Sequence, residues 1–519
     1  MRKPLSSPTL TDRPASKGMR TTFAIFSGIE RVGNKLPHPF WLFWILAAVV
    51  AVLSAILAGL DVSVISPADN KPVVIKSLLS AEGLQTMIGD IVDNYASFPP
   101  LATILTTMLG IVIAERSGLF DTALRLTITR MPARFVTFGL SFAAMISHVA
   151  GDAAYVTLIP LGAIIFRAVG KSPVLGAIVA FVSISAGYDA SPSLTTTDVL
   201  LSSITTAAAH TIDESITVTP VANYFFGLAS SLLIAVTITV VVETVLAKRP
   251  DLHVDEDYVA DEEGDAKQLE ISAKQRAALR WSLIFGLVYI AAVVAVLIPH
   301  GSPFRGEEAS ILESPIFSGM AGVIGLLFAG MGAIYGAVSG SYAGPKDLIA
   351  AMIQGFKNMA PILVLFFAIS QFLAYFKWTG IGEVMAIKGA ELLKGASAPG
   401  WLILLGMAVI ISIMNFVITS GSAMWSLAAP IFVPMLLLLG IEPATTQAAY
   451  RVADSVTNCV TPMSPYFVMA LGFIQQYRKS AGIGTLASFT MPLAAVVWVV
   501  WMAFFLAWYV IGIPFGPAG

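Results

Sequence analysis

This sequence contains few cysteines, few histidines and few charged residues. A single cysteine, Cys459, occurs in 519 residues, so neither an intrachain disulfide nor a cysteine metal cluster can form. The five histidines are scattered, and no H-E-x-x-H motif supports a zinc hydrolase. Charged residues make up 12% of the chain, about half the share typical of soluble domains. The net charge of -2 and the scattered basic residues give no patch that would bind nucleic acid.

Apolar residues dominate instead. They make up 56% of the chain, and the mean hydropathy is +0.81. The lipid bilayer is therefore the expected surrounding of most of this surface. The first 38 residues carry seven basic residues and no apolar core that a signal peptidase would recognise. We interpret this tail as cytoplasmic, which makes the first span, 39–60, run from inside to outside.

The lengths of the apolar runs predict nine crossings, because a helix needs about 20 apolar residues to span a bilayer. Seven uninterrupted spans are expected at 39–60, 98–114, 221–247, 281–299, 315–343, 359–376 and 486–513, and two broken helices at 174–212 and 444–476. The stretches 119–130 and 377–394 mix charged and apolar residues, as interfacial helices do. A charged cytoplasmic linker, 248–280, is expected to separate a first half, 39–247, from two scaffold spans in 281–343 and a second half, 344–519.

Two further apolar stretches, 135–166 and 401–440, are interrupted near their middle, at 147–152 and 419–422. The arms of the first are only about 15 residues long, which is too short to cross the bilayer. This stretch begins and ends beside basic residues, so we predict a re-entrant hairpin that opens from the cytoplasm. The second stretch is predicted to open from outside. The alternative is that both arms of each stretch cross fully as kinked helices.

The order of elements is the same in both halves, but the two hairpins open from opposite sides. This is the pattern of inverted-topology repeats, whose paired interrupted segments form the substrate site of many secondary transporters. The sequence therefore predicts an all-α polytopic membrane protein with nine transmembrane helices, two re-entrant helical hairpins and two inverted repeats with broken helices. The expected location is a bacterial inner membrane, with the N-terminus cytoplasmic and the C-terminus outside.

Charged residues inside apolar runs are expensive unless they face a partner or water. Arg451 and Asp454 lie three residues apart, hence on one helical face. They form either a structural ion pair or a site in which Arg451 binds a substrate carboxylate and Asp454 orients it or takes a proton or Na⁺.

The other breaks also carry ionisable or oxygen-bearing residues. Asp198 lies where the first broken helix resumes, and is either a helix N-cap or part of an ion-coupling site. Asp152 at the first hairpin tip is open to the same two interpretations. Asn458 and Pro462 lie at the second break, where side-chain oxygens and free carbonyls suit Na⁺. We expect a possible Na⁺ at Asp198 and Asn458, and no other cofactor.

The second hairpin tip places Ser422 three residues before Trp425. A tryptophan in a membrane usually packs or marks the interface, but beside a Ser-Gly-Ser turn it is also suited to stacking on an aromatic ligand. Pro443 and Pro462 bracket the helix that carries Arg451.

Three motifs resemble the p-aminobenzoyl-glutamate transporter (AbgT) family. They are Ser147 to Tyr155 (Ser-His-Val-Ala-Gly-Asp-Ala-Ala-Tyr), Trp425 to Pro434, and Gln447 to Asn458 continuing through Thr461 to Tyr466. The resemblance covers nearly the whole chain after the tail. It implies a homodimer of nine-span protomers with two hairpins, handling p-aminobenzoyl-glutamate or related folate fragments, with some members exporting sulfonamide antimetabolites. By this resemblance the substrate site consists of Asp198, Ser422, Trp425, Pro443, Arg451, Asp454 and Pro462.

The first break departs from the family pattern. Asp189, Ser191, Pro192 and Thr195 stand where Ser, Asn, Leu and Gly are common, and Met424 precedes Trp425 where a basic residue is common. An altered break would change the ion or the substrate.

These observations predict an ion-coupled secondary transporter for a small anionic aromatic substrate. The substrate expected is a p-aminobenzoyl-glutamate-like folate catabolite, a sulfonamide-type antimetabolite, or both. In this hypothesis Arg451 binds the carboxylate, Trp425 contacts the ring, and Asp198, Asp454, Asn458 and Asp152 serve ion coupling. The alternatives are a transporter of another small dicarboxylate, an ion channel, and a membrane-embedded amide hydrolase. No G-x-S-x-G or zinc motif supports the hydrolase.

Overall fold

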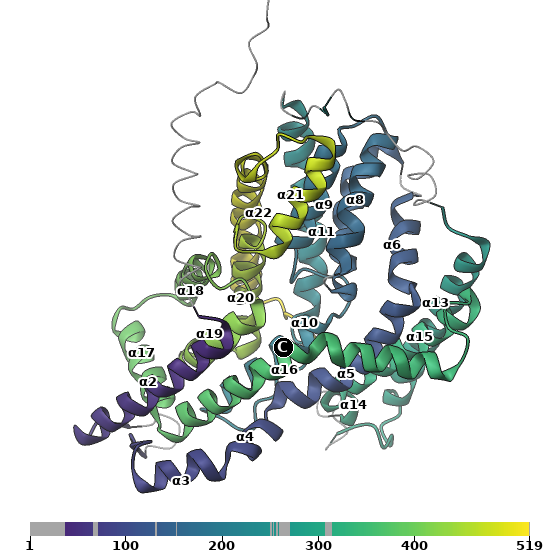
Figure 1. Cartoon of the computed structure of the whole chain (residues 1–519). Helices are drawn as coiled ribbons and strands as arrows, with labels where there is room; N and C mark the ends of the chain where they lie inside the picture. Colours follow the sequence, from purple (N-terminus) through teal and green to yellow (C-terminus); the bar gives the residue numbers. More distant parts are fainter. Residues whose placement is uncertain are drawn as a thin grey trace, which may run out of the picture.

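The computed structural model describes residues 37–65, 71–129, 132–151, 153–249, 252, 254, 255, 258, 270–306 and 314–517. Asp152, almost all of the basic tail 1–38 and much of the linker 248–280 lie outside the described residues. The regular secondary structure of the described part is helical apart from one two-stranded antiparallel sheet (Figure 1).

Seven helices of the described chain are long and apolar enough to cross a membrane. They are α2 (Pro39–Gly59), α5 (Pro99–Ser117), α11 (Tyr224–Thr244), α13 (Ala273–Leu297), α15 (Met320–Ser339), α16 (Pro345–Trp378) and α22 (Ile483–Ile511). Their outer faces expose large apolar side chains, such as Ile56 at 54% and Leu287 at 69%. Such faces suit contact with hydrocarbon.

Eight shorter helices surround the predicted interruptions. They are α7 (Val136–Ile146), α8 (Ala153–Ala168), α9 (Pro173–Ala186), α10 (Thr196–Ala209), α18 (Gly400–Asn415), α19 (Gly421–Leu437), α20 (Pro443–Thr457) and α21 (Pro465–Tyr477). The longest of them, α19, has 17 residues, which corresponds to about 26 Å at 1.5 Å per residue. None of the eight therefore spans a bilayer core of about 30 Å by itself.

The chain is interrupted in each of the four places that the sequence indicated. A 3₁₀ turn, η3 (Ser147–Ala150), follows α7, and irregular segments separate α9 from α10, α18 from α19, and α20 from α21. Glycine or proline borders these segments, which agrees with the way these residues end helices.

The remaining elements are short. They are β1 (Ser63–Ile65), β2 (Pro72–Val74), α3 (Ala81–Gly89), α4 (Ile91–Ala96), α6 (Leu119–Thr129), α14 (Pro315–Ser318), α17 (Ile381–Gly395), η2 (Ala133–Phe135) and η4 (Leu246–Lys248). The connection between the first two predicted spans contains β1, β2, α3 and α4. The Lys76 backbone N–H donates to the Thr379 carbonyl at 3.0 Å, so this segment is fixed to the end of α16.

Two long helices begin earlier than predicted. Their first residues are polar and were left out of the predicted apolar spans, but N-terminal capping hydrogen bonds stabilise them in helical conformation. The span expected at 359–376 is the last part of α16, whose N-terminus is capped by Asp347 Oδ2 accepting from the Ala343 and Gly344 N–H groups at 2.6 and 3.2 Å. The span expected from 281 begins at Ala273, where Ser272 and Gln275 form a capping box. The last residues of the predicted linker 248–280 are thus helical.

The broken helices meet at the centre of the molecule. In Figure 1, α10, α19 and α20 lie there, with α9, α11 and α22 above them and α5 and α16 below. Helix α10 packs on both α19 and α20, and α18 packs on α20. Segments from the first and second halves of the sequence therefore form one shared core.

Candidate functional site

The first broken helix resumes with a capping box. Thr195 is the N-cap of α10, and Asp198 occupies the third helical position. Asp198 Oδ2 accepts hydrogen bonds from the Thr195 N–H and hydroxyl at 2.7 and 2.8 Å. The expected capping role of Asp198 is therefore present, but its position is N3 and the N-cap itself is Thr195.

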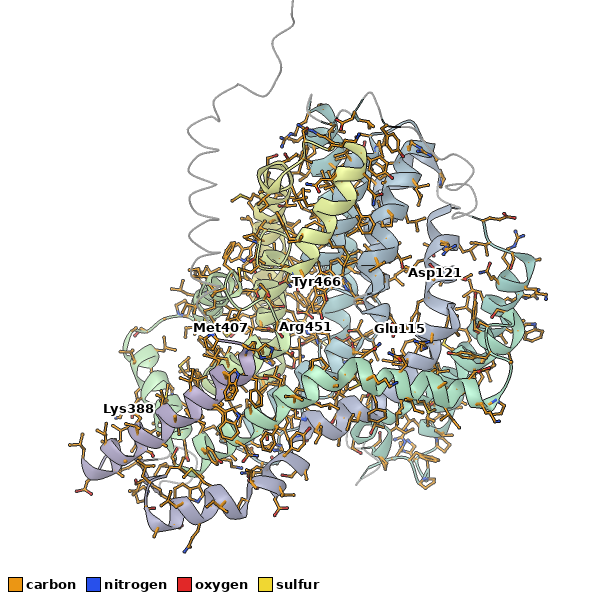
Figure 2. All side chains as sticks on the ribbon, in the orientation of Figure 1. Glu115, Asp121, Lys388, Met407, Arg451 and Tyr466 are labelled. Carbon is orange, nitrogen blue, oxygen red and sulfur yellow. The ribbon has the colours of Figure 1, made fainter. Side chains whose placement is uncertain are left out.

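The other oxygen of Asp198 binds Arg451. Arg451 Nη1 and Asp198 Oδ1 are 2.8 Å apart, and their side chains are 3% and 13% exposed. Arg451 lies in the interior of the molecule (Figure 2). The ion pair expected between Arg451 and Asp454 is not the one that forms. Arg451 is instead paired across space with the first broken helix, and so joins the two halves of the site.

Asn223, just before α11, continues this network. Its Oδ1 accepts from Arg451 Nε at 3.1 Å and from Gln447 Nε2 at 2.9 Å. Thr205 of α10 donates to Gln447 Oε1 at 2.6 Å, and Trp425 Nε1 donates to the Thr205 hydroxyl at 2.9 Å. Buried charge at Arg451 is thereby compensated by hydrogen bonds as well as by Asp198.

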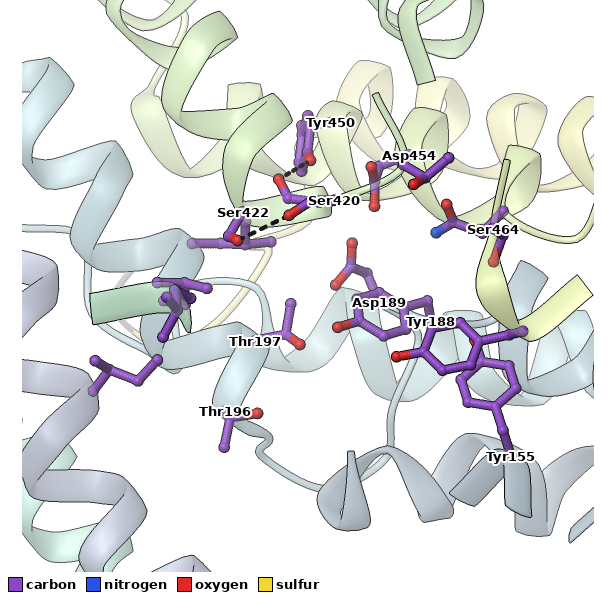
Figure 3. A pocket seen from close by; sticks show the side chains of 18 of the residues that line it. Tyr155, Tyr188, Asp189, Thr196, Thr197, Ser420, Ser422, Tyr450, Asp454 and Ser464 are labelled. Carbon is purple, nitrogen blue, oxygen red and sulfur yellow. Dashed lines mark hydrogen bonds between the residues drawn. The ribbon is translucent and has the colours of Figure 1, made fainter. Parts of the chain in front are cut away.

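A cavity of about 400 Å³ lies beside this network. It lies between the first broken helix, the start of α19 and the second broken helix (Figure 3). Its lining residues are Ile104, Met108, Tyr155, Tyr188, Asp189, Thr196, Thr197, Leu200, Leu201, Met359, Ile362, Thr419, Ser420, Gly421, Ser422, Tyr450, Asp454, Asn458, Ser464, Pro465 and Tyr466. This volume lies within the range of about 300–1,000 Å³ that is usual for small-molecule sites.

Two carboxyl groups, those of Asp189 and Asp454, border the cavity. Both residues are buried, and their four carboxyl oxygens make no hydrogen bond with the described residues. Gly421 leaves little room beside Asp454, since a Cβ at that glycine would lie 3.0 Å from Asp454 Oδ2. The start of α19, which is the positive end of that helix, thus lies next to one of the two carboxyl groups.

Three comparisons with known proteins decide the family. Residues 24–519 match the model of the AbgT putative transporter family. This chain belongs to that family. It is 35% identical over 496 residues to the p-aminobenzoyl-glutamate transport protein of Escherichia coli K12, an alignment that covers 95% of this chain and 96% of the relative.

Two solved AbgT-family structures share the fold. The YdaH transporter of Alcanivorax borkumensis matches with a TM-score of 0.85 at 35% identity, covering 93% of this chain and 100% of YdaH. MtrF of Neisseria gonorrhoeae, reported to illuminate a class of antimetabolite efflux pumps, matches with a TM-score of 0.89 at 36% identity, covering 95% and 99%. The chain is thus a multi-pass membrane transporter of the AbgT family.

Of the residues predicted for the site, Ser422, Asp454 and Asn458 line the cavity, whereas Arg451, Asp198 and Trp425 are not among its lining residues. Pro443 is the first residue of α20, and Pro462 lies in the segment that follows that helix. Asp152 lies outside the described residues.

The predicted Na⁺ ligands already have partners. Both oxygens of Asp198 are used by Arg451 and Thr195, and Asn458 Oδ1 accepts from Asn415 Nδ2 at 3.1 Å. Within the described residues no group of three or more His, Cys, Asp or Glu side chains is arranged to hold a metal ion. A Na⁺ at Asp198 and Asn458 would share these oxygens with their present partners, and it stays a prediction.

Sequence reasoning missed several residues that form the site. Asn223, Gln447 and Thr205 carry the hydrogen-bond network. All three are uncharged, and only Gln447 belongs to one of the three motifs, which it begins. Tyr155 and Tyr466 end two of the motifs that indicated the family, and their rings stack 4.0 Å apart at the cavity with an interplanar angle of 8°. Their position, as aromatic residues that end a motif beside a helix break, is the sequence feature that could have indicated them as site residues.

Trp425, which the sequence predicts to contact a substrate ring, is not among the lining residues of the cavity, and the ring contact stays a prediction. Its side chain is fully buried, lies 4.3 Å from the Tyr450 ring and donates its only N–H to Thr205. The aromatic rings that reach the cavity belong to tyrosines.

Proposed function

We propose that this AbgT-family chain is an ion-coupled secondary transporter of p-aminobenzoyl-glutamate-like folate catabolites, of sulfonamide-type antimetabolites, or of both. The observation that carries the proposal is the position of the cavity. It lies where two interrupted helices meet, beside the largely buried Asp198–Arg451 pair that connects them. Substrate sites at paired helix breaks are typical of transporters that work by alternating access.

The names of the relatives support the choice of substrate. One relative is a p-aminobenzoyl-glutamate transport protein, and MtrF is linked to antimetabolite efflux. The lining of the cavity, with tyrosine rings, hydroxyl groups and two carboxyl groups, suits a small aromatic molecule with polar groups.

The Asp198–Arg451 pair is proposed to couple the two halves during transport. Arg451 Nη2 is buried and has no hydrogen-bond partner in the described chain, so the guanidinium retains an unused donor beside Asp198. Relative movement of α10 and α20 would follow from a change in this pair, because the pair directly joins them.

A flux experiment tests this function. Labelled p-aminobenzoyl-glutamate and a labelled sulfonamide are measured in proteoliposomes under separately imposed Na⁺ and pH gradients. A coupled transporter accumulates substrate against its own gradient under at least one of these conditions. Flux that only equilibrates and ignores both gradients would indicate a channel, and cleavage of the aminobenzoyl amide would indicate a hydrolase.

The oligomeric state belongs to the same proposal. We propose a homodimer in which each protomer has its own cavity. The mass of the purified chain in detergent, corrected for bound detergent, measures the assembly. A monomer that transports at full rate would contradict the homodimer while leaving the transport function intact.

A further inference from the structure

The ionisable groups of Asp, Glu, Lys, Arg and His type that line the cavity are all acidic. Among its described lining residues these are Asp189 and Asp454, and lysine, arginine and histidine are absent. Arg451 lies close enough to Asp189 to interact with it electrostatically, but it is not a lining residue, is 3% exposed and is paired with Asp198. A ligand in this cavity therefore meets carboxyl oxygens that can accept hydrogen bonds.

Donor groups lie beside both carboxyl groups, Ser455 beside Asp189 and Tyr450 and Asn458 beside Asp454, but none makes a hydrogen bond of normal geometry to them. All four of their carboxyl oxygens are buried without a partner in the described chain. Tyr450 and Asn458 lie beside Asp454, but the Tyr450 hydroxyl donates to the Gly421 carbonyl at 2.6 Å. Buried carboxyl oxygens without a well-formed hydrogen bond are costly, so a ligand N–H group that enters the cavity gains hydrogen bonds to them.

Tyrosine rings stand next to these carboxyl groups. Tyr188 precedes Asp189 in the chain, and both lie near Tyr155 in Figure 3. Tyr155 is itself stacked on Tyr466. A flat aromatic ring placed against Tyr155 and Tyr188 would present its substituents toward Asp189 and Asp454.

We propose that this cavity recognises the aminophenyl end of the substrate, with Asp189 and Asp454 accepting hydrogen bonds from its amino group. The ring lies against the tyrosines, and any carboxylate of the substrate points away from this wall. The inference rests on the proposed transport of an aromatic substrate. It explains how one cavity would take both substrate types, since p-aminobenzoyl-glutamate and sulfanilamide-type molecules share a 4-aminophenyl group.

The chemistry of the two carboxyl groups favours this end of the molecule. An aromatic amino group carries two N–H donors, and a pair of carboxylates can accept both. A substrate carboxylate at the same place would face two groups of its own charge, which is destabilising in a buried site.

The test uses pairs of ligands that differ only in the amino group. Binding of sulfanilamide and benzenesulfonamide to the purified full-length chain is measured by calorimetry, as is binding of p-aminobenzoyl-glutamate and benzoyl-glutamate. Loss of the amino group is expected to weaken binding about 10-fold or more in both pairs, as for loss of hydrogen bonds to a charged group. Equal affinity within each pair would overturn the proposal.

Variants connect the preference to these carboxyl groups. Asp189→Asn and Asp454→Asn are expected to reduce the preference for the amino ligand to about threefold or less, because the amide is a weaker, uncharged acceptor. Asp213→Asn, in the loop after α10, is the matched control and keeps the full preference. An unchanged preference in both Asp189→Asn and Asp454→Asn would overturn the assignment, and the wild-type ligand pairs remain decisive if either variant fails to fold.

Flux measurements separate this inference from the proposed function. If proteoliposomes transport the amino and des-amino ligands equally well, with equal affinities, the transport function stands and the inference fails. If the chain prefers amino ligands in binding but moves neither across the membrane, the inference stands and the transport of these substrates fails.

Discussion

At the scale of single residues, the Asp198–Arg451 pair is the main electrostatic feature of the site. Removing one member leaves the other buried without its counter-charge, which typically costs about 3–5 kcal/mol. We expect Arg451→Met and Asp198→Leu each to lower the melting temperature in detergent strongly and to abolish flux. The double variant Asp198→Leu/Arg451→Met is expected to be more stable than either single variant, because no unpaired charge remains.

The partly exposed pair of Arg125 and Asp121 on α6 provides the control. Its side chains are 28% and 33% exposed, and Arg125→Met is expected to change stability by no more than about 1 kcal/mol. If the Asp198→Leu/Arg451→Met variant were as unstable as the sum of the two single variants, the pair would have no coupling and this account of it would be wrong.

Trp425 offers a second test at this scale. It is buried behind Tyr450, and its indole N–H donates to Thr205. Trp425→Phe keeps an aromatic ring and removes one hydrogen bond, so we expect a loss of stability of about 1 kcal/mol. Binding of aromatic ligands, measured by calorimetry, should change by less than about threefold. Loss of ligand binding with retained stability would instead support the ring contact that the sequence indicated.

The sequence identified the important charges but not their partners. Arg451 and Asp454 are close in sequence, so a pair between them was the local interpretation, whereas the actual partner is Asp198 in the other broken helix. Helical periodicity reports neighbours on the same helix only. A contact between distant segments depends on the packing of α10 against α20, which no local pattern contains.

At the scale of secondary structure, interruptions were predictable and helix starts were less so. Glycine and proline inside apolar runs correctly indicated the breaks. The long N-terminal part of α16 was missed because Lys346, Gln354 and Lys357 lower its hydropathy. The strands β1 and β2 were missed because each has only three residues, too few for an alternating pattern to be read.

Close packing of α5 against α15 gives a test of an element contact. A Cβ at Gly110 would lie 1.7 Å from the Gly325 carbonyl oxygen, so no side chain fits there without separating the two backbones. We expect Gly110→Ala to reduce the yield of folded protein and its melting temperature markedly. Gly322→Ala, also on α15, meets nothing within 4 Å and is expected to be neutral or slightly stabilising. Equal behaviour of the two variants would contradict this packing.

The end of α16 is connected to the loop after α10 by an ion pair. Lys377 Nζ lies 2.8 Å from Glu214 Oε1, and this hydrogen bond and charge lower the pKa of Glu214 below its ordinary value. A lowered pKa in the folded state means that the contribution to stability is present at neutral pH and is lost as the pH falls below about 4. We expect Lys377→Met to lower the melting temperature slightly at pH 7 and not at pH 3.

Removing the acid provides the control for this pair. In a Glu214→Gln background, Lys377→Met should have no effect at either pH, because the charge that Lys377 stabilises is absent. High salt should also reduce the difference at pH 7, since both side chains are largely exposed. A pH-independent effect of Lys377→Met would indicate that its alkyl chain matters and its charge does not.

At the scale of the whole molecule, composition alone predicted a multi-pass membrane protein, and the AbgT motifs predicted its family. Both predictions are confirmed, because apolar content and long motifs can be read from the sequence without knowing which residues are in contact. The nine crossings, the opposite openings of the two hairpins and the membrane orientation remain predictions. Helix positions within one chain do not fix which side of a bilayer each loop faces.

Labelling from the two sides of the membrane tests the inverted arrangement. Cys459 is buried and is the only cysteine, so Cys459→Ala gives a background without thiols. Ala168→Cys, at the end of α8, and Ala396→Cys, after α17, both replace exposed alanines. Inverted repeats require a membrane-impermeant maleimide applied to intact cells to label Ala396→Cys and to leave Ala168→Cys unlabelled until the membrane is opened.

The lysines near the second hairpin make this test demanding. Lys377, Lys388 and Lys394 lie close to its base, and the positive-inside rule would by itself place such residues in the cytoplasm. Arg167 and Lys171 lie equally close to the base of the first hairpin, so charge alone assigns both bases to the same side. Only the inverted arrangement of the helix breaks assigns the two hairpin bases to opposite sides of the membrane. Labelling of both cysteines from one side would therefore reject the inverted repeats, and with them the alternating-access scheme, while leaving the Asp198–Arg451 pair and the cavity unchanged.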